Sequence, residues 1–113
     1  MMLEEFLANW LQQKTGYDVY TEVPEGHPVE FYLVERTGSR TVNHVTTVTV
    51  AIQSWQSMSM YMAAAMNEDL KTVMDTLVQE PEISACRLST DYNFTDTDSK
   101  YYRYQAVYNI TTF

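Results

Sequence analysis

The N-terminal segment carries apolar side chains at the spacing of one helix face. Residues 2–15 are predicted to form an amphipathic helix, and Gly16 is suited to end it. Glu4 and Glu5 fall in the first turn and Lys14 in the last, where each charge favours the helix dipole. The apolar face of this helix consists of Leu3, Phe6, Leu7, Trp10 and Leu11.

A second helical pattern occupies the middle of the chain. It begins at Ser57 or Ser59, either of which could cap the first turn, and continues to Val78. Pro81 prevents the helix from continuing further. Its predicted buried stripe consists of Met58, Met62, Met66, Leu70, Val73 and Leu77. The spacing therefore predicts a helix that packs on the rest of the domain mainly through methionine and leucine.

Between the two helices the pattern changes to that of β-strands. Residues 17–23 form a short extended segment, and residues 24–28 contain prolines and a glycine and predict a turn. Residues 29–36 are apolar on both faces at their centre, which indicates a strand in the interior of a sheet. Residues 37–41 contain a Gly-Ser pair and predict a hairpin connection. Residues 42–53 follow as a strand with alternating apolar and polar side chains.

Two further strands follow the second helix. Residues 83–94 and 100–113 both alternate between apolar and polar side chains, and residues 95–99 form the turn between them. The predicted core-facing side chains are Cys86, Leu88, Tyr92 and Phe94 in the first strand, and Tyr102, Tyr104, Ala106, Tyr108 and Ile110 in the second. Each strand thus offers one largely apolar face to the core.

The predicted elements follow the order α-β-β-β-α-β-β. Two helices packed on one face of a largely antiparallel sheet of four to five strands would bury all of these stripes, which predicts an α+β fold. The opposite face of the sheet is expected to be polar but weakly charged, because threonine, asparagine, glutamine and serine dominate it. A chain of 113 residues, 1–113, fits a single domain.

The chain is strongly acidic. It contains 7 lysine and arginine residues against 15 aspartate and glutamate residues, which gives a formal net charge of −8. Its basic residues are scattered, whereas tight phosphate binding depends on clustered cations, so the sequence argues against a protein that grips nucleic acid or an anionic membrane. It has neither an apolar run long enough for a membrane span nor a secretion-signal pattern, and we expect a cytosolic protein at synthesis.

The sequence contains no recognisable catalytic, metal-binding or cofactor-binding pattern. His27 and His44 lack metal-ligand spacing to each other or to Cys86, which falls on an apolar strand face and is expected to be a core residue. The aspartates within residues 91–98 lack the glycine and the distal glutamate of an EF-hand loop, so we expect a solvated turn there. We expect a protein that is not an enzyme and that needs no cofactor.

Several side chains outside the predicted core point to contacts with other proteins. Met60 lies off the stripe of the second helix, Tyr61 flanks that stripe, and Tyr101 points away from the core face of its strand. Strand edges without charged residues would also pair with a neighbouring chain. The sequence therefore favours a protein that works by assembling with other proteins.

Three segments resemble the tail terminator, or tail-completion, proteins of long-tailed bacteriophages and of prophages of Gram-positive bacteria. These segments are YTEVPEGHPVEFYLVERTGS, TVTVAIQSWQSMSMYMAAAMNEDLKTVM and STDYNFTDTDSKYYRYQAVYNITTF. Their most specific parts are VERTGS, VAIQSW and DYNFTDTDSKYYRYQAVYNI. The resemblance covers nearly the whole chain, and none of its motifs is catalytic.

The resemblance implies a structural role in the virion. Such proteins are similar to the phage lambda tail terminator, an α/β fold that forms a hexameric ring, caps the tail tube and stops the addition of tube subunits. The implied partners are other copies of the chain, the tail tube protein and the head-tail connector. Genomic DNA would pass through the lumen without specific binding. The implied location is the head-proximal end of the tail, after assembly in the host cytoplasm.

Subunit contacts in such a ring are expected at residues 37–43, at residues 91–100 and at the start of the second helix. The predicted interface residues are Arg36, Arg40, Met60, Tyr61, Asp96, Asp98, Tyr101 and Arg103. The three arginines suit bidentate pairs with carboxylates of a neighbouring subunit. The alternative for each charge is a solvated surface side chain.

Two other functions are compatible with the sequence. A head-tail joining or head-completion subunit has a similar size and a related ring-forming role. A small-ligand-binding α+β domain is a different class, and it should contain a concave apolar cavity and occur as a monomer or dimer.

Overall fold

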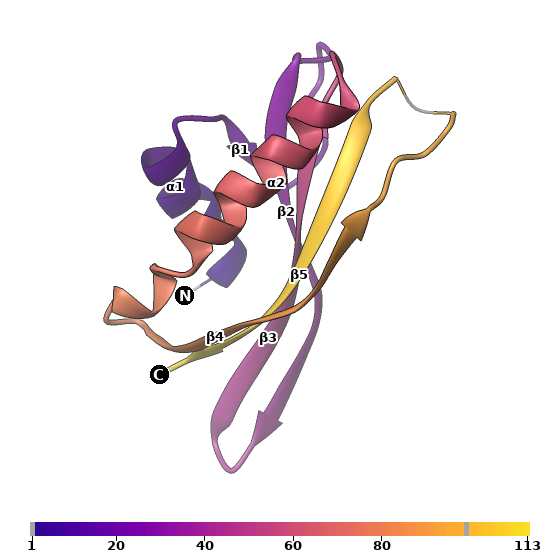
Figure 1. Ribbon diagram of the computed structural model, residues 1–113. Coiled ribbons are helices and arrows are strands. Elements are labelled where there is room, and N and C mark those ends of the chain that lie inside the picture. The colour runs from indigo at the N-terminus through magenta and orange to yellow at the C-terminus, as the bar shows by residue number, and fades with distance from the viewer. Residues whose placement is uncertain (1, 99) are drawn as a thin grey trace.

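A computed structural model describes residues 2–98 and 100–113 (Figure 1). The elements are α1 (Leu3–Thr15), β1 (Val19–Tyr20), β2 (Glu30–Val42), β3 (Val45–Gln56), α2 (Met60–Met74), a 3₁₀ turn η1 (Leu77–Gln79), β4 (Ile83–Asn93) and β5 (Tyr102–Thr112). This order confirms the predicted α+β fold. Ser99, at the end of the predicted turn 95–99, lies outside the described residues.

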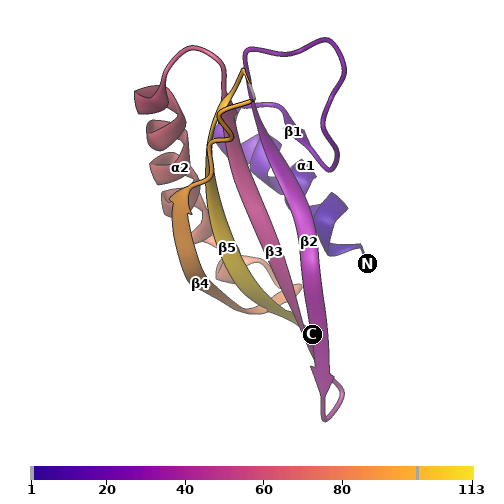
Figure 2. The same cartoon turned by 90° about the vertical axis from the view of Figure 1, so that its right-hand side faces the viewer.

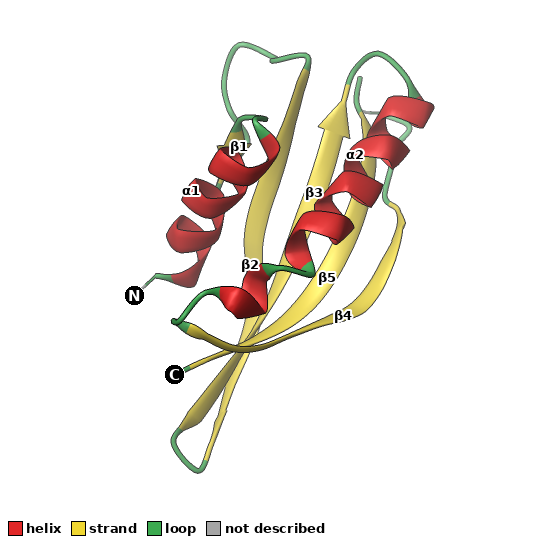
Figure 3. Ribbon diagram, turned by 60° about the vertical axis from the view of Figure 1, so that its left-hand side comes forward, coloured by secondary structure: helices red, strands yellow, loops and turns green. Residues whose placement is uncertain are grey.

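The strands form one five-stranded sheet in the order β1-β2-β3-β5-β4. β1 runs parallel to β2, and the other neighbours are antiparallel. Both helices lie on the same face of the sheet, as predicted (Figure 3). The other face, called the open face below, carries no helix in the described part of the chain (Figure 2). At Tyr32 and Leu33, β2 has a partner on each side, which confirms its predicted interior position there.

The first helix forms where its apolar face predicts it. Leu3, Leu7 and Leu11 are at most 2% exposed and pack against the sheet side of the domain. Gly16 ends the helix in the left-handed region with φ 78°, and its N–H donates to the carbonyl of Gln12 at 3.1 Å. A residue without a Cβ adopts this conformation at little cost, which explains the position of the helix end.

The second helix begins at one of its two predicted caps, but it ends at Met74 rather than Val78 and faces the sheet differently than predicted. Ser59 caps it by accepting a hydrogen bond from the N–H of Met62 at 3.0 Å, so Ser59 rather than Ser57 is the cap. Met58 precedes the helix and is 68% exposed, and Met62 is 42% exposed, so the predicted stripe is wrong at both positions. Ala63 is fully buried instead, because a small side chain lets the helix approach the sheet closely. The buried side of the helix consists of Ala63, Met66, Asn67, Leu70 and Met74.

The hairpin between β2 and β3 is longer than predicted. Residues 37–41 continue β2, and the turn lies at Asn43 and His44, which have positive φ angles of 51° and 65°. Two successive positive φ angles are typical of a type I′ turn, whose twist matches that of the flanking strands. A β-bulge between Arg36 and Gly38 accommodates the Gly-Ser pair within the strand. The tip of the hairpin consequently extends beyond the helices (Figure 1).

A bulge in β4 reverses the faces of its side chains. The predicted common face was Cys86, Leu88, Tyr92 and Phe94. This prediction is wrong, because the pairing with β5 shifts register between Leu88 and Thr90. Cys86 packs on the helix side, whereas Tyr92 lies on the open face, where its hydroxyl accepts a hydrogen bond from Gln105. One extra residue moves every following side chain of the strand to the other face.

The main core lies between the two helices and the sheet. Tyr32 projects into it from β2, is fully buried, and donates its hydroxyl hydrogen to the carbonyl of Met66 at 2.7 Å. Burial raises the pKa of Tyr32, so its hydroxyl remains a donor at all moderate pH values. Trp10 donates its indole N–H to a carboxylate oxygen of Glu80 at 2.8 Å, which joins α1 to the segment after α2.

Asp91 ties the edge strand β4 to α2. Its carboxylate accepts hydrogen bonds from Lys71 Nζ at 2.9 Å and from Asn67 Nδ2 at 3.0 Å. The hydrogen bond from Lys71, followed by that from Asn67, holds the pKa of Asp91 below its usual range despite partial desolvation. The ionised form of this side chain therefore stabilises the contact between the helix and the strand.

Replacing Asp91 with asparagine is expected to lower the free energy of unfolding by about 1 kcal/mol at neutral pH, because the amide loses the charge that pairs with Lys71. A carboxyl whose pKa is lowered by folding contributes above its unfolded pKa of about 4 and loses that contribution as the pH falls through the folded value. Urea titrations at neutral and acid pH should therefore show a difference between wild type and Asp91→Asn that shrinks in acid.

Glu68→Gln is the matched control for this prediction. Glu68 pairs with the same lysine at 3.1 Å, but its side chain is 70% exposed, so solvent screens the pair. We expect a change within about 0.3 kcal/mol for this variant. An effect of Asp91→Asn that is unchanged between neutral and acid pH would contradict the role of the ionised carboxylate.

Candidate interaction surface on the open face of the sheet

The open face is divided into three bands that cross the strands. An aromatic band lies at the end away from the hairpin tip, a glutamine band follows, and a band of threonine and asparagine lies towards the hairpin. Strand register creates the bands, because it places Gln53 opposite Gln105 and Thr49 opposite Asn109. The predicted polar character of this face is confirmed for two of the three bands.

The aromatic band forms a second, smaller core. The rings of Phe31 and Trp55 stack with centroids 5.2 Å apart, and Tyr101 meets Trp55 edge-on at 5.1 Å. All three side chains are at most 9% exposed. The hydroxyl of Tyr101 donates to the carbonyl of Pro28 at 2.6 Å, and Tyr20 packs on Phe31 from the side of β1. These contacts close the open face at this end without a helix.

Arg103 is held between two aromatic rings beside this cluster. Its guanidinium carbon lies 4.7 Å from the ring centroid of Trp55 and 5.2 Å from that of Phe94. One guanidinium nitrogen lies 3.8 Å from a carboxylate oxygen of Asp96, and the side chain is only 14% exposed. A cation over an aromatic face is attracted by the ring quadrupole, so Arg103 is engaged within its own chain.

A chain of hydrogen bonds runs across the glutamine band. Trp55 donates its indole N–H to Gln53 at 2.8 Å, and the amide of Gln53 donates to Gln105 at 2.8 Å. The amide of Gln105 in turn donates to the hydroxyl of Tyr92, so the chain links β3, β5 and β4. Both glutamines are at most 9% exposed. Their amides are thus satisfied within the sheet and fix the side chains of this band.

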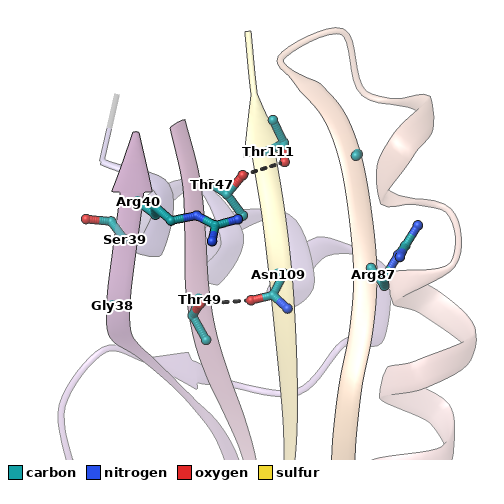
Figure 4. A pocket seen from close by; sticks show the side chains of 9 residues that line it. Gly38, Ser39, Arg40, Thr47, Thr49, Arg87, Asn109 and Thr111 are labelled. Atoms are coloured by element: carbon teal, nitrogen blue, oxygen red, sulfur yellow. Dashed lines mark hydrogen bonds between the residues drawn. The ribbon is translucent and has the colours of Figure 1, made fainter. Parts of the chain in front are cut away.

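The third band, called the polar floor below, lines a hollow of about 640 Å³ on the open face (Figure 4). Its residues are Gly38, Ser39, Arg40, Thr47, Thr49, Ala85, Arg87, Asn109 and Thr111. The hydroxyls of Thr47 and Thr111 lie 3.0 Å apart, and Thr49 donates its hydroxyl hydrogen to Asn109 Oδ1 at 2.8 Å. The hollow is open and polar, unlike the concave apolar cavity expected of a small-ligand binder.

Two arginines frame the polar floor. Arg40 reaches from β2 across the floor towards Thr47, whereas Arg87 extends outward from the edge strand β4 (Figure 4). Both side chains are exposed, and neither forms an ion pair within residues 2–98 and 100–113. Arg36 and Lys71, by contrast, pair with carboxylates of the same chain at 2.8–3.1 Å. Arg40 and Arg87 are consequently available to an external anion.

The outer edges of two strands are unpaired over much of their length in the described part of the chain. β4 pairs only with β5, and β2 pairs with β1 only at Tyr32 and Leu33, which leaves residues 35–42 with β3 as their only partner. Unpaired backbone N–H and C=O groups on a sheet edge can accept a strand from another chain.

Some of the predicted interface residues are accessible. Tyr61 is 81% exposed at the start of α2, and Arg40 and Asp98 are also exposed. Met60 is half-buried, and its sulfur accepts a hydrogen bond from the side-chain amide of Asn93 at 3.5 Å. These residues do not form one patch by themselves, because Arg40 lies in the hairpin and the others lie towards the opposite end of the molecule (Figure 1).

The other predicted interface residues are engaged inside the chain. Arg36 pairs with Glu4 of α1 at 2.8 Å, and Arg103 pairs with Asp96. The expectation of an exposed Tyr101 is wrong, since its ring is 9% exposed and packs in the aromatic band. The loop before β5 places this ring against the sheet, which strand alternation alone does not reveal.

Sequence reasoning missed two features of this surface. Alternation places Arg87 on the polar face of its strand, but its cross-strand neighbour Asn109 is set by strand pairing, which a single strand does not reveal. Trp55 lies beyond the predicted strand end at residue 53, although it belongs to β3 and continues the alternation of Thr49 and Gln53 on the open face. The run of alternating residues up to Gln56 is the signal that could have identified it.

The structure also places the cysteine and the two histidines considered in the sequence analysis. Cys86 is half-buried against the main core, and burial raises its pKa to about 11, so it is present as an unreactive thiol. His27 and His44 lie outside the strands with positive φ angles. The described residues contain no group of histidine, cysteine, aspartate and glutamate side chains placed to hold a metal ion. None of the described helices is both long enough and apolar enough to cross a membrane.

Comparison with known proteins does not assign a family. No protein-family model matches the chain, and no curated protein matches it. The resemblance to tail terminators therefore rests on the sequence motifs described above.

Proposed function

We propose that this protein is a structural subunit of a long-tailed phage that forms a ring at the head-proximal end of the tail tube. The ring would end tube polymerisation and provide the surface that joins the head connector. The observation that carries the proposal is the pair of outer strand edges, on β2 and β4, that flank an open sheet face and are unpaired over much of their length in the described part of the chain. The resemblance of the sequence to tail terminators supplies the biological setting.

The position of these edges favours a ring over a simple dimer. The outer edge of β2 and that of β4 lie on opposite sides of the sheet, so contact between them joins unlike surfaces of two subunits. Such a contact is heterologous, and it closes into a ring when the rotation between neighbours divides a full turn. Tail terminators similar to the lambda protein form rings of six, and we propose the same number here.

The charge of the chain suits a ring that encloses DNA without holding it. Its net charge of −8 repels the phosphate backbone at any lumen wall that carries acidic side chains. DNA would then move through the lumen without stable contacts.

Deletion of the gene from its parent phage, followed by negative-stain electron microscopy of the lysate, tests this proposal. Overlong tails beside unjoined heads are expected, because nothing would stop the addition of tube subunits. Tails of normal length that fail to attach would replace the proposal with a head-tail joining role. Intact, infectious virions would contradict both and would redirect attention to ligand binding.

A further inference from the structure

We propose that the polar floor is a docking surface for carboxylates on a second copy of this chain, with Arg40 and Arg87 as the residues that bind them. The inference rests on the proposed ring, and it identifies a surface by which neighbouring subunits recognise one another. Arg87 and the threonine and asparagine side chains of the floor are assigned here by the structure alone.

The distribution of charge is the first argument. All 15 acidic residues of the chain lie outside the lining of the polar floor, which contains two arginines and no carboxylate. In a chain with a net charge of −8, this surface is a local positive patch beside a predominantly acidic remainder. A second copy therefore offers the complementary charge, and the attraction is between unlike surfaces of identical chains.

The hydrogen-bonding groups of the floor also suit carboxylates. Thr49 uses its hydroxyl hydrogen on Asn109 Oδ1, so Asn109 presents its amide nitrogen as a free donor in the described part of the chain. In the pair formed by Thr47 and Thr111, one hydroxyl hydrogen is used and the other remains available. With the guanidinium of Arg40 above them, these donors match the acceptor-only oxygens of an ionised carboxylate.

The polar floor includes residues of β2 and β4, the two strands whose outer edges are largely unpaired in the described part of the chain. It spans the sheet from β2 to β4, and Arg87 extends outward from β4 (Figure 4). A subunit that approached the outer edge of β4 would meet Arg87 first, and its acidic side chains could then reach the floor. Arg87 thus lies on one of the two strand edges that the proposed ring brings together.

Nucleic acid is a poorer occupant of this surface. Binding to a polyanion depends on several cations that act together, and the floor offers two within an acidic protein. Separate carboxylates on a folded partner can instead pair with single arginines while the remaining charges stay apart.

Sedimentation velocity of the full chain over a concentration series at low ionic strength tests the proposal. Wild type is expected to self-associate, and added salt should weaken the association because exposed charges are screened. The double variant Arg40→Glu/Arg87→Glu should associate at least about tenfold more weakly, because two attractive contacts become repulsive. Circular dichroism confirms that the variant is folded.

The triple variant Asn9→Asp/Gln13→Glu/Lys14→Glu is the matched control. It makes the same change in net charge, and all three positions are exposed on α1, outside the polar floor and outside the predicted subunit contacts. We expect a change in its association constant of less than about threefold. Wild type that remains monomeric throughout the series, equal weakening in the arginine variant and the control variant, or no weakening in the arginine variant would each overturn the proposal. Binding of a DNA oligonucleotide that the arginine variant alone loses, without self-association, would do the same.

Failure of this inference can be told apart from failure of the proposed function. Overlong tails after gene deletion, together with normal self-association of the arginine variant, would leave the terminator role standing and reject the docking surface. Charge-dependent self-association together with intact virions after deletion would support the docking surface and reject the terminator role.

Discussion

Replacing Trp55 with alanine is expected to lower the free energy of unfolding by about 3–5 kcal/mol. The indole is the centre of the aromatic band, where it stacks on Phe31 and meets Tyr101 edge-on. Its removal leaves a cavity between these rings, because the sheet backbone cannot collapse to fill it. The side chain of Gln53 also loses the hydrogen bond that it accepts at 2.8 Å. Urea unfolding followed by circular dichroism measures the change.

Two further variants show whether the effect comes from the aromatic packing. Trp55→Phe keeps most of the ring and loses the indole N–H, so we expect a loss of about 1–2 kcal/mol. Tyr61→Ala removes an aromatic side chain that is 81% exposed, and the expected change is within about 0.5 kcal/mol. Equal losses for Trp55→Ala and Tyr61→Ala would show that the open face has no second core.

The fold was largely predictable because each element has a local signal. The apolar spacing from Leu3 to Leu11, the left-handed Gly16 and the prolines set the order of helices and strands, and the structure confirms that order. Errors in the faces of strands arise where one inserted residue changes the phase of a pattern. The bulges after Arg36 and Leu88 each insert a residue, and a period of two cannot show which face follows the insertion.

The candidate surface was less predictable, because it depends on pairs of residues far apart in the sequence. The polar character of the open face followed from single strands, but its division into bands depends on register. Gln53 and Gln105, for example, meet only because β3 pairs with β5, although α2 and β4 lie between these two strands in the sequence. The sequence predicts Arg103 as a contact residue for neighbouring subunits, whereas the fold places it between two aromatic rings of its own chain. A sequence shows the sign of each charged side chain, whereas the tertiary structure determines whether that side chain is free to bind a partner.

The second large prediction concerns which side of α2 faces the sheet. It compares Met66 with Met62, because the sequence pattern places both on the same buried stripe. Met66 is 2% exposed in the main core, and its sulfur lies 3.9 Å from the amide nitrogen of Gln56. Met66→Ala is expected to cost about 2–4 kcal/mol of unfolding free energy through lost burial and a residual cavity. Met62 lies one turn earlier and is 42% exposed, so Met62→Ala should cost about 0.5 kcal/mol or less.

The substitutions Met66→Ala and Met62→Ala distinguish the predicted orientation of α2 from the observed one. A continuous methionine stripe, as the sequence pattern indicates, would make the two substitutions similarly costly, whereas the structure places Ala63 against the sheet in place of Met62. Both changes introduce alanine into the same helix, so the gain in helix propensity is common to the two and cancels in their difference. Urea titrations of both variants under the same conditions give that difference directly. A difference below about 1 kcal/mol would reject the observed rotation of α2 and favour the predicted stripe.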